Sequence, residues 1–152
     1  MLGKCSIGCE CYYISKFLFA GKIQIKGLCS GTYDNNKQEI TSPNYPRNYH
    51  NSKTCTWKLE APQGRRIGLK FLDFDLEQSS GCRYDWLKVY NGGSVSSPVL
   101  KDKFCGTNRP SNVASSGNQL FLKFHTDGDA SKTGFKIAYN LKCEYHCVSK
   151  II

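Results

Sequence analysis

The chain has 152 residues and a formal net charge of +9, and this length is sufficient for one domain with a substantial hydrophobic core. It has no run of about 18 apolar residues, which argues against a membrane-spanning helix. The basic residues are scattered, and several alternate with apolar residues as on the solvated face of a sheet, which argues against a nucleic-acid-binding protein.

Residues 1–28 differ from the rest of the chain, because cysteines cluster there, turn residues are few, and no periodicity of two or 3.6 is sustained. We interpret them as a poorly defined N-terminal extension, either a leader or the remnant of a preceding module. The apolar run at residues 12–20 is interrupted by Lys16 and is a poor match to a secretion signal. The regular domain is expected at residues 29–142, followed by a tail at 143–152.

From residue 29 onward, short alternating segments separated by Gly, Pro, Asn or Ser predict an all-β sandwich. No convincing helix is found there. The clearest strands are expected at residues 55–59, 67–71, 86–90, 120–124 and 135–139, where apolar side chains recur at every second position. The predicted inward-facing core residues are Trp57, Leu69, Phe71, Leu87, Val89, Leu122, Phe124, Phe135 and Ile137.

Nine cysteines are a high number for this length. Four of them border the predicted strands at well-separated positions: Cys29, Cys55, Cys82 and Cys105. Because such spacing favours disulfides, we expect an oxidising, extracellular compartment.

The remaining cysteines cluster near the two ends of the chain, and their pairing is left open. They are Cys5, Cys9, Cys11, Cys143 and Cys147. Together with His146 they could hold zinc if the two ends meet, but their spacings do not match a zinc finger and disulfides are favoured. Since the total is odd, at least one thiol is unpaired or intermolecular, which would allow a covalent dimer.

Acidic residues gather beside predicted strands in two places that are far apart in sequence. Glu77 and Asp85 precede the strand at 86–90, and Asp127 and Asp129 follow the strand at 120–124. Converging carboxylates without a cation would repel and raise one another's pKa values. Ca²⁺ takes about six to eight oxygen ligands, commonly from carboxylates, backbone carbonyls and water. The pattern predicts a calcium site on a β-domain and therefore a binding module.

An enzyme is the main competing class. The chain has three histidines, His50, His125 and His146, but it has no His-Glu-x-x-His, no Gly-x-Ser-x-Gly and no Gly-x-x-x-x-Gly-Lys motif. His125 precedes Asp127, where a Ser-His-Asp arrangement can be imagined, but a solvated or supporting histidine is the better interpretation. We predict that this chain is not an enzyme.

Short motifs occur in a fixed order along residues 29–141. They are Cys29-Ser30-Gly31, Ile40-Thr41-Ser42-Pro43-Asn44-Tyr45-Pro46, Tyr49, Cys55-Thr56-Trp57, Phe74-Asp75-Leu76-Glu77, Cys82-Arg83-Tyr84-Asp85, Phe104-Cys105-Gly106, Ser115-Ser116-Gly117-Asn118 and Gly134-Phe135. In this order and spacing the chain resembles a CUB domain, the extracellular β-sandwich module of complement proteases, tolloid-like proteases, neuropilin and cubilin.

The resemblance implies a two-sheet antiparallel jelly-roll-like sandwich with two disulfides, Cys29 to Cys55 and Cys82 to Cys105. Each bridge would close a loop worth about 3.5 kcal/mol in the chain-entropy description of disulfides.

Many CUB domains carry a calcium site, and the resemblance implies one here. Glu77, Asp85 and Asp127 would be carboxylate ligands, and Tyr49 would hydrogen-bond and orient Glu77. A backbone carbonyl near Asp129 would help to complete the shell, so Asp129 is included among the metal-site residues.

One position departs from the family pattern. Ala130 stands where many calcium-binding members have an Asn shortly after the last Asp, so that side-chain oxygen is missing. Asp129 or a water molecule would replace it.

In calcium-dependent CUB domains the ion rigidifies loops at one end and holds acidic oxygens open to a partner's lysine. The resemblance implies that Glu77, Tyr84 and Asp127 would make this contact. The expected function is that of a secreted protein-interaction module that binds a lysine on a secreted or cell-surface protein.

Two alternatives stay open. The first is a calcium-independent CUB module that binds a glycan or heparin-like polyanion. Its basic patch would be Arg65-Arg66 with Lys101-Asp102-Lys103, and an aromatic carbohydrate surface would comprise Tyr33, Tyr45, Tyr49, Trp86 and Tyr90. Strand aromatics are more often core residues, so the aromatic surface is the weaker version. The second alternative is a non-catalytic CUB fragment of a larger secreted protease.

Overall fold

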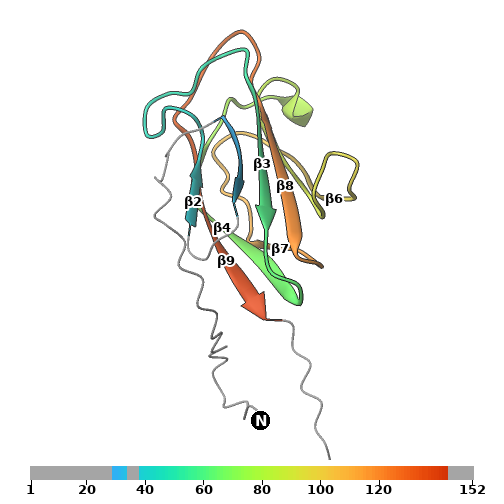
Figure 1. Cartoon of the computed structure of the whole chain (residues 1–152). Helices are drawn as coiled ribbons and strands as arrows, with labels where there is room; N and C mark the ends of the chain where they lie inside the picture. The colour runs from blue at the N-terminus through green and yellow to red at the C-terminus, as the bar shows by residue number, and fades with distance from the viewer. Residues whose placement is uncertain (1–28, 34–37, 144–152) are drawn as a thin grey trace, which may run out of the picture.

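The computed structural model describes residues 29–33 and 38–143, which form two packed β-sheets (Figure 1). The strands are β1 (Ser30–Tyr33), β2 (Gln38–Thr41), β3 (Thr54–Glu60), β4 (Arg65–Asp75), β5 (Trp86–Tyr90), β6 (Val99–Phe104), β7 (Val113–Ala114), β8 (Gln119–His125) and β9 (Gly134–Cys143). Within the described residues, the only helical element is one 3-10 turn, η1 at Ser80–Cys82. The predicted extension at 1–28 and residues 144–152 of the predicted tail lie outside these ranges.

The two sheets have the strand orders β1-β3-β8-β5-β6 and β2-β9-β4-β7. The predicted all-β, two-sheet sandwich is therefore confirmed. One pairing corrects the expectation of an antiparallel arrangement, because β1 runs parallel to β3. The Cys29–Cys55 disulfide explains this direction, since it joins the residue before β1 to the second residue of β3 and so aligns the starts of both strands.

All five strands expected from the alternating pattern are present, and most extend further than predicted. The expected segment at 67–71 is part of the longer β4, which continues to Asp75 through a register shift between Phe71 and Asp73. The four strands that the pattern did not predict, β1, β2, β6 and β7, are the four edges of the two sheets. Edge strands have one neighbour and one solvated side, so their sequences carry little alternation.

The hydrophobic core lies between the sheets, and all nine predicted core residues are buried there. Phe135 is at its centre and makes edge-to-face contacts with Trp57 and Phe124, with ring centroids 5.7 and 5.2 Å apart. A large apolar side chain buried in this way contributes about 1.5–3 kcal/mol. The core also includes Tyr49, which lies outside every strand and is 2% exposed.

Both predicted disulfides, Cys29–Cys55 and Cys82–Cys105, are present. The second joins the end of η1 to the residue after β6. Next to it, the Leu76 amide donates a hydrogen bond to the Gly106 carbonyl at 3.0 Å. These connections fix the segment between β4 and β5, which carries two of the predicted acidic ligands.

Gly134 begins β9 at a point of close approach between loops. Its φ is +88°, and a Cβ here would overlap the Ser42 hydroxyl and lie 3.4 Å from the Tyr49 ring. The buried Ser42 Oγ accepts a hydrogen bond from the Phe135 amide at 3.0 Å, and the Tyr49 amide donates to the Lys132 carbonyl at 2.9 Å. The absence of a side chain at Gly134 therefore lets Tyr49 pack against the start of β9.

We expect Gly134→Ala to be more destabilising than Gly64→Ala. Gly64 also has a positive φ, +76°, but no atom lies within 4 Å of an added Cβ. Gly64→Ala should cost about 1–2 kcal/mol from left-handed backbone strain alone. Gly134→Ala should cost about 1–3 kcal/mol more because the added methyl group also overpacks the site. Urea unfolding of the two oxidised variants measures both losses, and equal losses would contradict this role of Gly134.

Candidate metal centre

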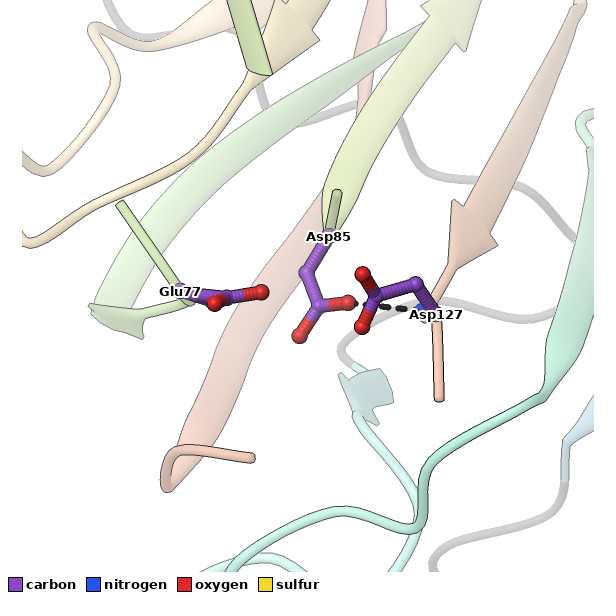
Figure 2. A group of neighbouring side chains, drawn as sticks. All are labelled: Glu77, Asp85 and Asp127. Atoms are coloured by element: carbon purple, nitrogen blue, oxygen red, sulfur yellow. Dashed lines mark hydrogen bonds between the residues drawn. The ribbon is translucent and has the colours of Figure 1, made fainter. Parts of the chain in front are cut away.

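Three carboxylates converge at one end of the sandwich, as Figure 2 shows. Asp85 immediately precedes β5 and Asp127 lies two residues after β8. Because Trp86 at the start of β5 pairs with His125 at the end of β8, strand register brings these two acids together. Glu77 lies two residues after β4 of the other sheet. One oxygen from each carboxylate lies within 4.8 Å of the other two.

Asp85 is the fixed member of the group and has no solvent exposure. Its Oδ1 accepts a hydrogen bond from the Asp127 amide at 2.8 Å, and its Oδ2 accepts one from the Tyr49 hydroxyl at 2.5 Å. A buried carboxylate is tolerated only when hydrogen bonds replace its lost water. Both oxygens of Asp85 are thus held in place before any ion binds.

Tyr49 forms the predicted hydrogen bond with Glu77, but through the Glu77 backbone amide and not through its carboxylate. The hydroxyl contacts Glu77 only by accepting a hydrogen bond from its backbone amide, at 3.1 Å, and it donates its proton to Asp85. A phenol has one proton to donate, and the buried carboxylate is the stronger acceptor. Burial and the bond to Asp85 both raise the pKa of Tyr49, so it stays protonated and orients Asp85.

Glu77 is the unsatisfied member. Its Oε2 is buried and has no hydrogen-bond partner among the described residues. Burial raises the pKa of the Glu77 carboxyl, and the negative charges of Asp85, Asp127 and Asp129 raise it further. A buried acceptor without a donor costs free energy, and a cation in contact with it would remove that cost. Three converging carboxylates with one orphaned oxygen are a donor set that suits a hard cation such as Ca²⁺.

Asp129 does not belong to the group of three carboxylates. Its backbone amide donates to Asp127 Oδ1 at 3.0 Å, and its own Oδ1 accepts a hydrogen bond from the Ala130 amide at 2.9 Å. Asp129 therefore shapes the loop that presents Asp127. The structure brings together three of the four predicted metal-site residues, and the fourth lies beside them in sequence.

Ala130 occupies a left-handed backbone conformation, with φ of +47°. This region costs most L-residues energy, whereas Asn and Gly adopt it readily. The geometry gives a physical reason why Asn is suited to this position, quite apart from its side-chain oxygen.

Thr126 is a positioning residue that the sequence analysis did not identify. It is 1% exposed, and its hydroxyl accepts a hydrogen bond from the Lys53 amide and donates one to the His50 carbonyl, both at 2.9 Å. Ser52 and Asp127 are joined next to it by a backbone hydrogen bond of 2.5 Å. A single threonine between a strand and an acidic loop carries no sequence signal for this function.

The other predicted site residues are dispersed. Tyr84, a predicted partner contact, is 45% exposed next to Asp85. His125 stacks on Trp86 with ring centroids 5.3 Å apart, and the structure shows no hydrogen bond between it and Asp127. The cysteines proposed as zinc ligands lie outside the described residues, except Cys143, whose side chain is not described.

Neither predicted alternative surface is assembled as expected. The basic pair Arg65-Arg66 lies on β4 and the 101–103 segment on β6, and these strands belong to different sheets. The five aromatic residues do not form one surface, because Tyr49 is buried in the core. Tyr45 lies in the loop after β2, whereas Trp86 begins β5 in the other sheet, and the side chain of Tyr33 is not described.

Comparison with known proteins gives the family. A family model for the CUB domain matches residues 29–139. Bone morphogenetic protein 1 of Xenopus laevis is 36% identical over 137 residues, which cover 83% of this chain and 19% of that protein. Cubilin of Sus scrofa is 41% identical over 112 residues, which cover 74% of this chain and 3% of that protein. The chain thus spans only a small part of these relatives.

Solved structures agree with the sequence relatives. The crystal structure of the MASP-1 CUB2 domain bound to Ca²⁺ is similar with a TM-score of 0.66 and 28% identity, over 74% of this chain and 99% of that one. The full extracellular region of zebrafish Gpr126/Adgrg6 is similar with a TM-score of 0.69 and 34% identity, over 76% of this chain and 15% of that one.

The matched domain is a non-catalytic module, although some relatives are proteases, such as the astacin-like metalloendopeptidase of Coturnix japonica, which is 40% identical over 111 residues. Within residues 29–33 and 38–143, no helix has the length and apolar character needed to cross a membrane. The motif order, the two disulfides, the two-sheet fold and the family match lead to one conclusion. This chain belongs to the CUB domain family.

Proposed function

We propose that this chain is an extracellular, calcium-dependent protein-interaction module that captures a lysine side chain of its partner at the metal centre. The observation that carries the proposal is the buried, unpartnered Glu77 Oε2, which lies in a group with two further carboxylates. The similar CUB2 domain of MASP-1 was crystallised with Ca²⁺, which supports the choice of metal.

Glu77, Asp85 and Asp127 would hold the ion, together with a backbone carbonyl near Asp129 and water. When bound, Ca²⁺ supplies a positive charge that offsets the repulsion among the three carboxylates. The residues of this chain orient the ligands, because the Tyr49 hydroxyl donates a hydrogen bond to the Asp85 carboxylate and the same carboxylate accepts one from the Asp127 amide.

The partial exposure of the acidic residues supports lysine capture. Glu77 and Asp127 are half-buried, and Tyr84, which immediately precedes Asp85, is exposed. An ammonium group that reaches two oriented carboxylates forms charge-assisted hydrogen bonds, which are strong but weakened by salt. One such contact has modest affinity, so useful binding would rely on several copies of the module or on additional contacts.

An extracellular location is supported by the two disulfides, which persist in oxidising compartments. It is also supported by the similarity to a structure described as an extracellular region. Because the chain covers only part of its relatives, we further propose that it works as a non-catalytic module of a larger secreted protein.

Calcium should stabilise the full oxidised chain, and Glu77→Gln should remove this effect. At one hundred times its dissociation constant, calcium bound only to the folded state adds about 2.7 kcal/mol, which thermal unfolding and calorimetry both detect. Without calcium, the raised pKa of Glu77 means that the wild type loses stability as pH rises from the ordinary carboxyl range toward neutrality. Glu77→Gln should escape that loss and be the more stable calcium-free protein at pH 7.

Glu39→Gln is the matched control, because Glu39 is an exposed acid on β2 that pairs with Lys136 at 3.0 Å. It should keep the full calcium response. A Glu77→Gln variant that responds to calcium like the wild type would overturn the metal centre.

Ala130→Asn should strengthen calcium binding. Ala130→Gly is the comparison that separates the relief of backbone strain from the addition of an oxygen ligand. Both substitutions relieve the backbone strain at φ of +47°, worth about 1–2 kcal/mol. Only Asn adds an oxygen ligand, so calorimetry should give a lower calcium dissociation constant for Asn than for Gly. Equal calcium affinities in the two variants would show that residue 130 acts through the backbone alone.

Tyr84→Ala should weaken lysine capture without weakening calcium binding. Surface-immobilised peptides with four lysines should retain the wild-type chain when calcium is present. Retention should be lost when a chelator is added, and also when the lysines of the peptide are acetylated. Tyr84 is exposed and immediately precedes Asp85 in the sequence, so its removal should reduce retention several-fold while the calcium-induced stabilisation persists. Retention that is unchanged by chelator would contradict lysine capture, even if calcium binds.

A further inference from the structure

The outer face of the five-stranded sheet carries a second cluster of side chains, separate from the three carboxylates. We call it the Trp86 face and define it by Trp86, Lys88, Lys103, Phe121, Lys123 and His125, from β5, β6 and β8. On β8 the alternating burial pattern places Phe121, Lys123 and His125 outward, since Leu120, Leu122 and Phe124 are buried in the core. The sequence analysis placed Lys103 in a basic patch and Trp86 in an aromatic surface, but it did not group these residues with each other.

Two lysines face each other across neighbouring strands. Lys88 on β5 and Lys123 on β8 are direct register partners. Like charges in this arrangement destabilise a sheet. Lys88 is compensated by Asp102, whose Oδ1 lies 3.1 Å from its Nζ. Among the described residues, Lys123 has no carboxylate within ion-pair distance, so this central strand carries a charge that no ion pair offsets.

The indole of Trp86 holds the ammonium groups in place. The Nζ atoms of Lys103 and Lys123 lie 4.9 and 5.9 Å from its ring centroid, and His125 stacks on the same side chain. A cation–π contact fixes an ammonium without neutralising its charge. In the described part of the chain, neither Lys103 nor Lys123 forms an ion pair with a carboxylate. Both ammonium groups can therefore contact an anionic ligand, while the nearby Asp102 carboxylate is paired with Lys88.

The surroundings favour a polymer of repeated anionic groups over a protein partner. Tight protein interfaces are anchored by large side chains buried at their centre. On the Trp86 face the two large apolar side chains, Trp86 and Phe121, are half-buried, and the indole is already contacted by Lys103, Lys123 and His125. A sheet face that holds ammonium groups at fixed positions suits a linear chain of sulfate and carboxylate groups, whose contacts are ionic and need no apolar anchor.

We propose that the Trp86 face is a binding site for a sulfated polysaccharide, with Lys103 and Lys123 as the principal anion contacts and Trp86 as the residue that positions them. This binding does not require calcium, because the lysines are held by the indole and by strand register. It is independent of lysine capture at the metal centre, so either proposal can fail without the other.

The test is titration of a heparin-derived dodecasaccharide into the full oxidised chain, with chelator present and over a range of salt concentrations. The double variant Lys103→Gln/Lys123→Gln should bind at least tenfold more weakly. The slope of log affinity against log salt should fall by about two, as expected when two contacts to a polyelectrolyte are lost. The matched control is Lys70→Gln/Lys142→Gln, which removes the same charge from exposed positions on β4 and β9.

The control should bind within about twofold of the wild type, and calcium-free thermal unfolding checks that both double variants are folded. Trp86→Leu removes no charge, and it should weaken binding about threefold because it releases the two lysines. Equal losses in the two double variants would show that diffuse positive charge is responsible and would overturn the site. An absence of wild-type binding at 100 mM salt would also overturn the site. Competition by polyglutamate that is as effective as competition by the polysaccharide would overturn it too, because it would indicate an acidic protein as the ligand.

Discussion

The hydrogen bond from the Tyr49 hydroxyl to Asp85 is the interaction on which the candidate site depends. It lies in a buried position, where Asp85 has no solvent exposure and Tyr49 has almost none. A carboxylate there is acceptable only because the phenol and the Asp127 amide satisfy its two oxygens. The same hydroxyl accepts a hydrogen bond from the Glu77 amide, so Tyr49 joins the Glu77 and Asp85 segments directly and the Asp127 segment through Asp85.

The fold is arranged so that this tyrosine is held rigidly. Tyr49 packs edge-to-face on Phe124 of β8, with ring centroids 5.3 Å apart, and against the bare backbone of Gly134 at the start of β9. The Cys82–Cys105 disulfide holds the segment that precedes Asp85. Residues from both sheets thus position the carboxylates. The free energy gained by burying the core offsets the repulsion among these three carboxylates and keeps them close together.

Much of this could be predicted from the sequence, but for different reasons in different places. Central strands such as β3 and β8 alternate strictly because both of their edges are paired and one face is buried, so the pattern predicts their existence and core residues, and their limits to within one residue at each end. The edge strands lack that constraint and were missed. The acids were found because of their spacing and family resemblance. The direction of the Tyr49 proton, the orphaned Glu77 oxygen and the cluster around Trp86 depend on contacts between distant segments, which no local pattern records.

We propose that the three carboxylates, one of which has an unsatisfied oxygen, hold a calcium ion. The most direct measurement is a crystal structure of the oxidised chain grown with calcium. We expect an ion about 2.3–2.6 Å from oxygens of Glu77, Asp85 and Asp127, with the Tyr49–Asp85 hydrogen bond intact. A structure in which Glu77 turns outward to solvent, and no ion lies between the carboxylates, would contradict it.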